Sequence, residues 1–198
     1  MRDFEETVAK LKKIKGKVRG SCSESMVNYL RAIGKEKYFP KIQEKLREYG
    51  SEERMEQIDS LKWYPIAFEV VLIFSIKEVL NWEEKEIKEL GKNVPKMSMV
   101  VKLLMKYFLS AKRSYRETPT YWKKHFNFGE ILTPEFNEKE KYFILRIKDF
   151  NLHPLYCKFL EGYFETMATF VIRAKNFESK EIRCSFKGHP YHEFKISW

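Results

Sequence analysis

Four side chains of metal-ligand type lie in the C-terminal quarter of the chain: Cys157, Glu181, Cys184 and His192. Two thiolates, an imidazole and a carboxylate form a ligand set that a borderline-soft ion such as Zn²⁺ binds in a tetrahedron. His189, in the turn before His192, is an alternative fourth ligand. The chain has no CxxC pair, so a second interpretation stays open, in which the cysteines are core residues and the histidine is simply hydrogen-bonded.

One helix and the hairpin that follows it must position these residues. The apolar spacing of residues 153–174 predicts a helix with Cys157 near its start. Residues 180–186 and 191–198 alternate as two strands joined by a short turn. Because side chains alternate between the faces of a strand, His192 is expected to point inward, toward the helix.

The same alternation raises a difficulty for Glu181 and Cys184. These residues are three positions apart, so a regular strand places them on opposite faces. Both can reach one ion only where a β-bulge or the end of the strand intervenes.

The order of the expected elements predicts an α+β fold. Most of residues 1–128 have helical patterns, and two strands follow at 129–136 and 141–150, before the helix and the hairpin. This order indicates a helical layer packed on an antiparallel sheet, with a helix-rich N-terminal part. Residues 1–60 are expected to form an N-terminal helical extension that acts as a lid or a dimerisation element. Residues 61–198 are expected to form the ligand-binding α+β domain.

Large aromatic rings are placed near the ends of several expected helices. A small number of polar tips among apolar walls is the usual composition of a ligand pocket. The competing interpretation of each ring is plain core packing. The candidate pocket residues are Trp63, Tyr64, Phe68, Tyr107, Phe108, Trp122, Phe126 and Phe128.

From about residue 63 onward the chain resembles the 4-vinyl reductase family of small-molecule-binding domains and a related bacterial family of unassigned function. The segments that carry the resemblance are "WYPIAFEVVL", "TPTYWKKHFNFG", "LHPLYCKFLEGYF" and "EIRCSFKGHPYHEFKISW". In the family's sensor members, a cysteine before a Gly-Tyr pair, a glutamate and two further cysteines hold a zinc ion. The matching residues here are Cys157, Glu181, Cys184 and His192, the last of which departs from the pattern. The resemblance therefore implies a structural zinc ion as the cofactor.

The resemblance also implies a fold and a type of partner. The family is similar in fold to heme-based nitric oxide sensors and to a Golgi-vesicle tethering subunit, with a helical layer over a curved antiparallel sheet. Such domains are often dimeric and enclose an apolar pocket. A homodimer that binds a small hydrophobic or aromatic ligand is thus expected, as a sensor or carrier.

The sequence argues against heme and against catalysis. The heme sensors have a Tyr-x-Ser-x-Arg pattern that binds the propionates, and this chain does not reproduce it. An axial ligand would have to be His125 or His153. The chain also lacks G-x-S-x-G, P-loop, G-x-G-x-x-G and H-E-x-x-H motifs, so a non-enzymatic role is expected.

The charge distribution supports an alternative function. The formal net charge is +10, and residues 10–20 hold six positive charges and no acid. An interaction module could use this basic arm to bind nucleic acid or an acidic partner, although no recognition motif accompanies it. The sequence has no apolar stretch long enough for a transmembrane segment. Three cysteines fit a reducing cytosol better than a disulfide framework, so a cytoplasmic location is expected.

Overall fold

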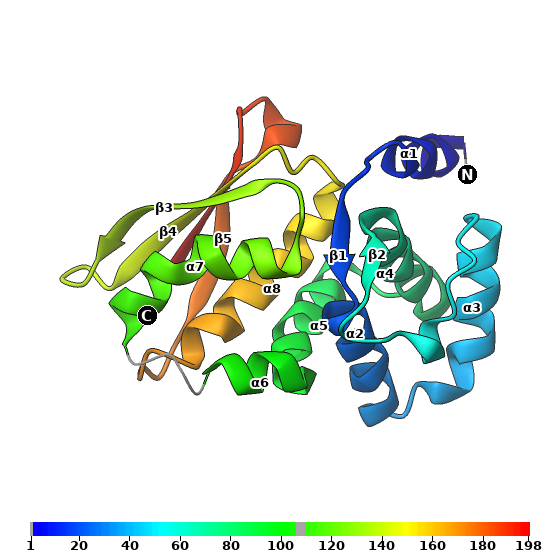
Figure 1. The fold of residues 1–198 in the computed structure, drawn as a ribbon, viewed down its shortest axis with the longest axis horizontal. Helices are drawn as coiled ribbons and strands as arrows, with labels where there is room; N and C mark the ends of the chain where they lie inside the picture. The colour runs from blue at the N-terminus through cyan, green and yellow to red at the C-terminus, as the bar shows by residue number, and fades with distance from the viewer. Residues whose placement is uncertain (1, 106–109) are drawn as a thin grey trace.

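The structure is a computed structural model, and it describes residues 2–105 and 110–198. It confirms the α+β class: all described α-helices except α8 lie before the four-stranded sheet in the chain (Figure 1). The α-helices are α1 (Arg2–Lys12), α2 (Ser21–Ala32), α3 (Phe39–Glu48), α4 (Ile66–Leu80), α5 (Glu84–Met97), α6 (Met99–Met105), α7 (Ala111–His125) and α8 (Pro154–Thr169). Within these described residues, no helix is long and apolar enough to cross a membrane.

The C-terminal part contains a four-stranded antiparallel sheet in the order β3-β4-β6-β5. Its strands are β3 (Glu130–Asn137), β4 (Tyr142–Lys148), β5 (Glu178–Arg183) and β6 (His192–Ser197). The predicted succession of strand, strand, helix, strand, strand is confirmed. Helices α7 and α8 cover one face of this sheet: Tyr115 of α7 packs on Phe143, and Phe164 of α8 packs on Phe194.

A second, two-stranded sheet joins the N-terminal helices to the rest of the molecule. It pairs β1 (Lys17–Arg19) with β2 (Trp63–Pro65), and Val18 of β1 also forms an isolated bridge to Phe126. Residues 1–60 therefore contact the later part of the chain through backbone pairing as well as through side chains. Their expected role as a lid or dimerisation element stays a prediction.

Helix α4 lies at the centre of the helical part. Every residue from Ile66 to Ile76 is buried, as expected for a helix that is apolar on all sides. One of these buried residues is Glu69, whose partners are described below.

Two local expectations differ from the structure. The apolar run 94–113 predicts one helix, but α5 ends at Met97 and α6 begins at Met99. Ser98 between them is extended, and its hydroxyl accepts a hydrogen bond from the N–H of Val101, which caps the new helix. Residues 51–60, expected to be helical, contain only a 3₁₀ turn at Met55–Gln57.

Candidate functional site

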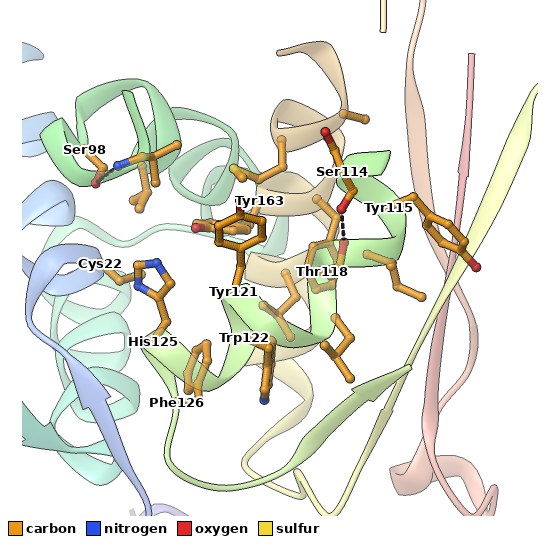
Figure 2. Close-up of a pocket in the computed structure, with 18 of the residues that line it drawn as sticks. Cys22, Ser98, Ser114, Tyr115, Thr118, Tyr121, Trp122, His125, Phe126 and Tyr163 are labelled. Carbon is orange, nitrogen blue, oxygen red and sulfur yellow. Dashed lines mark hydrogen bonds between the residues drawn. The ribbon is translucent and has the colours of Figure 1, made fainter. Parts of the chain in front are cut away.

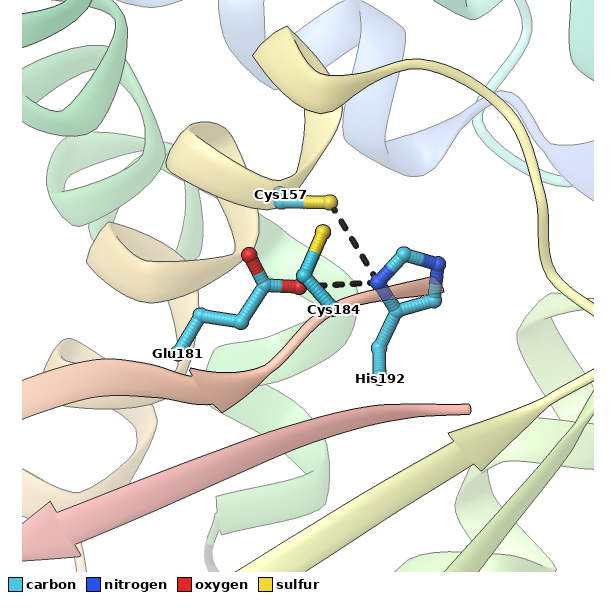
Figure 3. A group of neighbouring side chains, drawn as sticks. All are labelled: Cys157, Glu181, Cys184 and His192. Carbon is cyan, nitrogen blue, oxygen red and sulfur yellow. Dashed lines mark hydrogen bonds and ion pairs between the residues drawn. The ribbon is translucent and has the colours of Figure 1, made fainter. Parts of the chain in front are cut away.

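The four predicted metal-ligand residues converge in the structure. One ligand atom from each of Cys157, Glu181, Cys184 and His192 lies within 4.8 Å of the other three (Figure 3). His192 Nδ1 is 2.8 Å from Glu181 Oε1 and 3.5 Å from Cys157 Sγ. Both thiols and the imidazole are buried. We call these four residues the CECH cluster. His189, the alternative ligand, is exposed in the turn and lies outside it.

Helix α8 and the hairpin β5–β6 position the cluster. Cys157 lies in the first turn of α8, which begins at Pro154 and is capped by His153, whose Nδ1 accepts from the N–H of Leu155 at 3.0 Å. His192 opens β6 opposite Ile147 of β4, and it points inward as predicted.

A β-bulge removes the difficulty with Glu181 and Cys184. The pairing of β5 with β6 shifts between Glu181 and Arg183, and the strand ends at Arg183. The irregularity and the strand end together allow side chains three residues apart to face the same point. A second carboxylate, Glu161 of α8, accepts a hydrogen bond from the N–H of Glu181 at 3.0 Å and so ties the strand to the helix.

The electrostatics of the CECH cluster oppose free thiolates. Burial raises the pKa of the Cys157 thiol well above its ordinary value, and the nearby Glu181 and Cys184 raise it further. Burial is also the largest cause that raises the pKa of Cys184. Neutral thiols are poor nucleophiles, whereas a bound cation would favour the thiolate form that ligates it.

A cavity of about 150 Å³ lies between α7, α8 and the sheet (Figure 2). Residues of β1, α2 and α5 complete its walls, so the N-terminal part of the chain contributes to it. The walls are mainly aliphatic and aromatic. Polar side chains that reach it include Cys22, His125 and Tyr163.

His125 is the last residue of α7 and lies beside Cys22 in the view of the cavity (Figure 2). Burial lowers the pKa of His125, and the positive charges of Arg19 and Lys124 lower it further. Its imidazole is therefore neutral at neutral pH and has a lone pair that can bind a metal or accept a hydrogen bond.

The rings beside His125 give the cavity a firm wall. Trp122 and Phe126 stack at a centroid distance of 4.2 Å, and the indole N–H of Trp122 donates to the carbonyl oxygen of Phe128 at 3.3 Å. Phe150 packs edge-on against both stacked rings. A ligand in the cavity would contact apolar surfaces that are already fixed.

A buried carboxyl group contacts other residues that line the cavity. Glu69 is completely buried in α4, where it accepts hydrogen bonds from Ser23 at 3.0 Å and from the hydroxyl of Tyr156 at 2.5 Å. Burial raises its pKa, and burial also raises the pKa of the Cys22 thiol and of the Tyr163 hydroxyl, with Glu69 adding to both. Cys22, Tyr156 and Tyr163 line the cavity, so this acid is one side chain away from it.

The structure places two of the eight candidate pocket residues in the cavity wall: Trp122 and Phe126. Four others lie outside the lining of this cavity: Trp63, Tyr64, Phe68 and Phe128. Tyr107 and Phe108 lie outside the described residues.

Several residues of these sites are not predicted from the sequence. The sequence offers His125 only as an iron ligand, and it gives no signal that Cys22 and Tyr163 line a cavity. A signal for Glu69 was present, because it interrupts an apolar run of eleven residues, "IAFEVVLIFSI". Ser185, which contacts His192 at 2.7 Å, had no signal except its place directly after Cys184.

Comparisons with known proteins define the fold. No family model and no curated protein sequence matches the chain. Solved structures do match: an H-NOX protein from S. oneidensis in the Fe(II)NO ligation state has a TM-score of 0.68 at 13% identity and covers 90% of this chain and 98% of its own. An oxygen-binding H-NOX domain related to soluble guanylate cyclases, in its oxygen complex, has a TM-score of 0.62 at 10% identity, with 90% and 94% coverage. A structure described as modulating heme redox potential through porphyrin distortion has a TM-score of 0.64 at 8% identity, with 91% and 99% coverage.

These matches correct one expectation and leave others as predictions. The expectation that heme is unlikely is contradicted, because the solved structures that share the fold are H-NOX domains, one of them described by its heme redox potential. None of the matches supports the zinc ion that the resemblance implies. The specific resemblance to the 4-vinyl reductase family is likewise unsupported by any sequence match. Homodimerisation, nucleic-acid binding and a cytoplasmic location stay predictions. The chain has the fold of H-NOX domains, which agrees with the fold expected from the resemblance.

Proposed function

We propose that this chain is a ligand-binding sensor domain whose ligand occupies the cavity between α7, α8 and the sheet. The observation that carries the proposal is a partly buried, neutral imidazole, His125, in the wall of an otherwise mainly apolar cavity. A pocket with apolar walls and few polar groups is the usual form of a small-molecule site. The raised pKa values of the buried thiols fit a binding role better than nucleophilic catalysis.

Heme is the ligand that we test first. H-NOX structures of this fold are described as Fe(II)NO and oxygen complexes, and His125 is the histidine of this chain that lines the cavity. A bound heme would supply an iron that binds a diatomic gas. His125 can supply the nitrogen ligand that heme iron needs, because its neutral imidazole has a free lone pair.

The volume of the cavity and the uncharged character of its described walls favour a second class of ligand, a small uncharged aromatic molecule. A volume of about 150 Å³ is below the roughly 300–1,000 Å³ of pockets that hold drug-sized ligands, so a heme requires α7 and α8 to move apart. Among the described lining residues none is lysine or arginine, so the walls offer no ion pair to a carboxylate of the ligand. A small uncharged aromatic molecule fits the cavity without such a movement.

A hemin titration separates these two ligand classes. Wild-type protein is expected to shift the hemin Soret band, and His125→Ala to bind hemin more weakly, with the lost ligand restored by added imidazole. His189→Ala is the matched control, because His189 is exposed and lies outside the cavity. If wild type leaves the hemin spectrum unchanged but naphthalene raises its Tm, the ligand is a small aromatic molecule. If neither probe binds, the cavity is not a ligand site.

We also propose a metal ion at the CECH cluster. The supporting observation is the convergence of four ligand atoms of the types that bind borderline-soft divalent ions. Because four protein ligands leave no open position, such an ion would be structural and would fasten the hairpin β5–β6 to α8.

Titration with Co²⁺ tests this second proposal. Wild type and Cys22→Ser are expected to develop the same intense thiolate-to-cobalt absorption, and Cys184→Ser to lose much of it. Cys22 is a suitable control because it is the third cysteine and lies outside the cluster. The proposal fails if wild type shows no thiolate–cobalt absorption, or if Cys184→Ser retains all of it.

A further inference from the structure

We infer that Ser185 is a positioning residue for the CECH cluster, which holds the imidazole of His192 with Nδ1 directed at the ion. This inference rests on the proposal that the cluster binds a metal. Ser185 Oγ lies 2.7 Å from His192 Nε2, on the side of the ring that faces away from the cluster. Metal-binding histidines commonly use their second nitrogen in this way, and the second partner fixes the orientation of the ring and the site of its proton.

Proton counting around the ring shows why a hydroxyl suits this position. A neutral imidazole carries one proton, and His192 Nδ1 faces Glu181 Oε1 at 2.8 Å and Cys157 Sγ at 3.5 Å. Without an ion, a proton on Nδ1 can be donated to Glu181, and Nε2 then accepts from the Ser185 hydroxyl. With an ion, Nδ1 has to be unprotonated, so the proton lies on Nε2 and the same hydroxyl accepts it.

A serine hydroxyl can both donate and accept, so it satisfies both states of the ring without moving. Alanine at position 185 would leave Nε2 without this partner. His192 is only 2% exposed, so water is a poor substitute for the lost hydroxyl. The ring would then lose the contact that fixes its orientation on this side, and the direction of its Nδ1 lone pair would be held less firmly.

The backbone around Ser185 holds the hydroxyl in place. Ser185 begins a 3₁₀ turn, Ser185–Lys187, directly after the ligand Cys184. The carbonyl oxygen of Cys184 accepts from the N–H groups of Lys187 at 3.0 Å and His189 at 3.3 Å. Gly188 closes the turn at φ +87°, a left-handed conformation that glycine adopts readily. One short turn therefore supplies both a ligand and the group that orients the next ligand.

The test compares Co²⁺ binding by wild type, Ser185→Ala, Ser185→Thr and His189→Ala. Ser185→Ala is expected to bind Co²⁺ about 10–100-fold more weakly than wild type, with altered ligand-field bands. Ser185→Thr keeps the hydroxyl and is expected to recover most of the affinity and the wild-type spectrum. His189→Ala, in the same turn but outside the cluster, is expected to match wild type.

The outcomes separate the proposed metal site from the proposed role of Ser185 in that site. An absence of thiolate–cobalt absorption in wild type refutes the metal site itself. Wild-type affinity and spectrum in Ser185→Ala refute only the role of Ser185. An equal loss in Ser185→Thr and Ser185→Ala also refutes it, because the hydroxyl would then not be the cause. Denaturation of the metal-free variants serves as the folding control: each is expected to unfold cooperatively, with only Ser185→Ala less stable because His192 Nε2 loses its partner.

Discussion

At the scale of single residues, the most unusual group is the buried acid of α4. Glu69 is completely buried, and among the described residues it forms no ion pair. Its oxygens accept from the hydroxyls of Ser23 and Tyr156, which lie on α2 and α8. Three helices therefore meet at one carboxyl group. Burial raises its pKa despite these hydrogen bonds, so the native state retains its proton in a pH range where the unfolded chain has released it.

Glu69→Gln should remove a pH dependence of stability. Because the native state binds more protons than the unfolded state, the wild-type free energy of unfolding falls as pH rises from the ordinary carboxyl pKa through the raised one. Glutamine does not titrate, so the variant should gain stability relative to wild type as the pH rises above the ordinary carboxyl range. Urea denaturation at several pH values measures this, and parallel pH profiles for the two proteins would contradict it.

Glu69→Ala distinguishes hydrogen bonding from titration. Alanine leaves the hydroxyls of Ser23 and Tyr156 without their acceptor, which costs roughly 1–3 kcal/mol for each buried group. Alanine, like glutamine, does not titrate, so the pH profile of Glu69→Ala should run parallel to that of Glu69→Gln and lie below it by this loss. Coincident profiles of the two variants would show that the hydrogen bonds contribute little.

At the scale of elements, helix α8 connects every part of the proposed function. It contributes Cys157 to the CECH cluster and Tyr156 to the bonds of Glu69, and it lines the cavity with Tyr163. Its position is fixed by a very close crossing with α5. A Cβ atom on Gly162 would lie 2.0 Å from the carbonyl oxygen of Lys88, and one on Gly91 would lie 2.0 Å from that of Phe159.

Gly162→Ala should therefore separate α8 from α5 and destabilise the fold. The new methyl group meets backbone rather than a movable side chain, so we expect a loss of about 3 kcal/mol, at the upper end of typical overpacking costs. Gly34→Ala is the comparison, because its Cβ would meet nothing and its cost is limited to about 1 kcal/mol for a left-handed residue at φ +71°. Chemical denaturation compares the two, and equal losses would mean that the helices can move apart easily.

The elements also show how far the sequence could predict this molecule. Periodicity predicted the strands and α8, because the buried face of each leaves a local apolar pattern. The break at Ser98 is not predicted, because the apolar run continues through it and its local sign is one serine that caps α6. The crossing of Gly91 and Gly162 leaves no local pattern, because the partners are far apart in the chain. The convergence of the CECH cluster requires a β-bulge. The alternation of the strand shows that a bulge is needed but does not show where it lies.

At the scale of the whole molecule, the N-terminal helices and the sheet share one hydrophobic core. Buried side chains from the N-terminal segment 1–60, such as Leu11 and Leu30, belong to the same packed cluster as Phe159 and Phe194. The cavity is also lined from both parts, by Val18 and Cys22 as well as by α7 and α8. A ligand there would stabilise both parts together, by about 2.7 kcal/mol at a free concentration of 100 times its Kd.

A shared core predicts that the chain unfolds in one cooperative transition. Its tryptophans allow each part to be followed: Trp63 and Trp82 report on the helical part, and Trp122 and Trp198 on the sheet part. The variants Trp122→Phe/Trp198→Phe and Trp63→Phe/Trp82→Phe each leave one pair of reporters. Within each variant, the urea midpoints from fluorescence and from far-UV circular dichroism should coincide, as in two-state unfolding.

Both probes are compared within one variant, so any stability that the substitutions remove affects the two midpoints equally. Addition of a ligand that occupies the cavity should move both midpoints by the same amount, because residues of both parts line it. Separate midpoints in the Trp63 and Trp82 reporters would show instead that the helical part around α4 unfolds independently of the sheet part. In that case the backbone bridge between Val18 and Phe126 would be a weak link between two units.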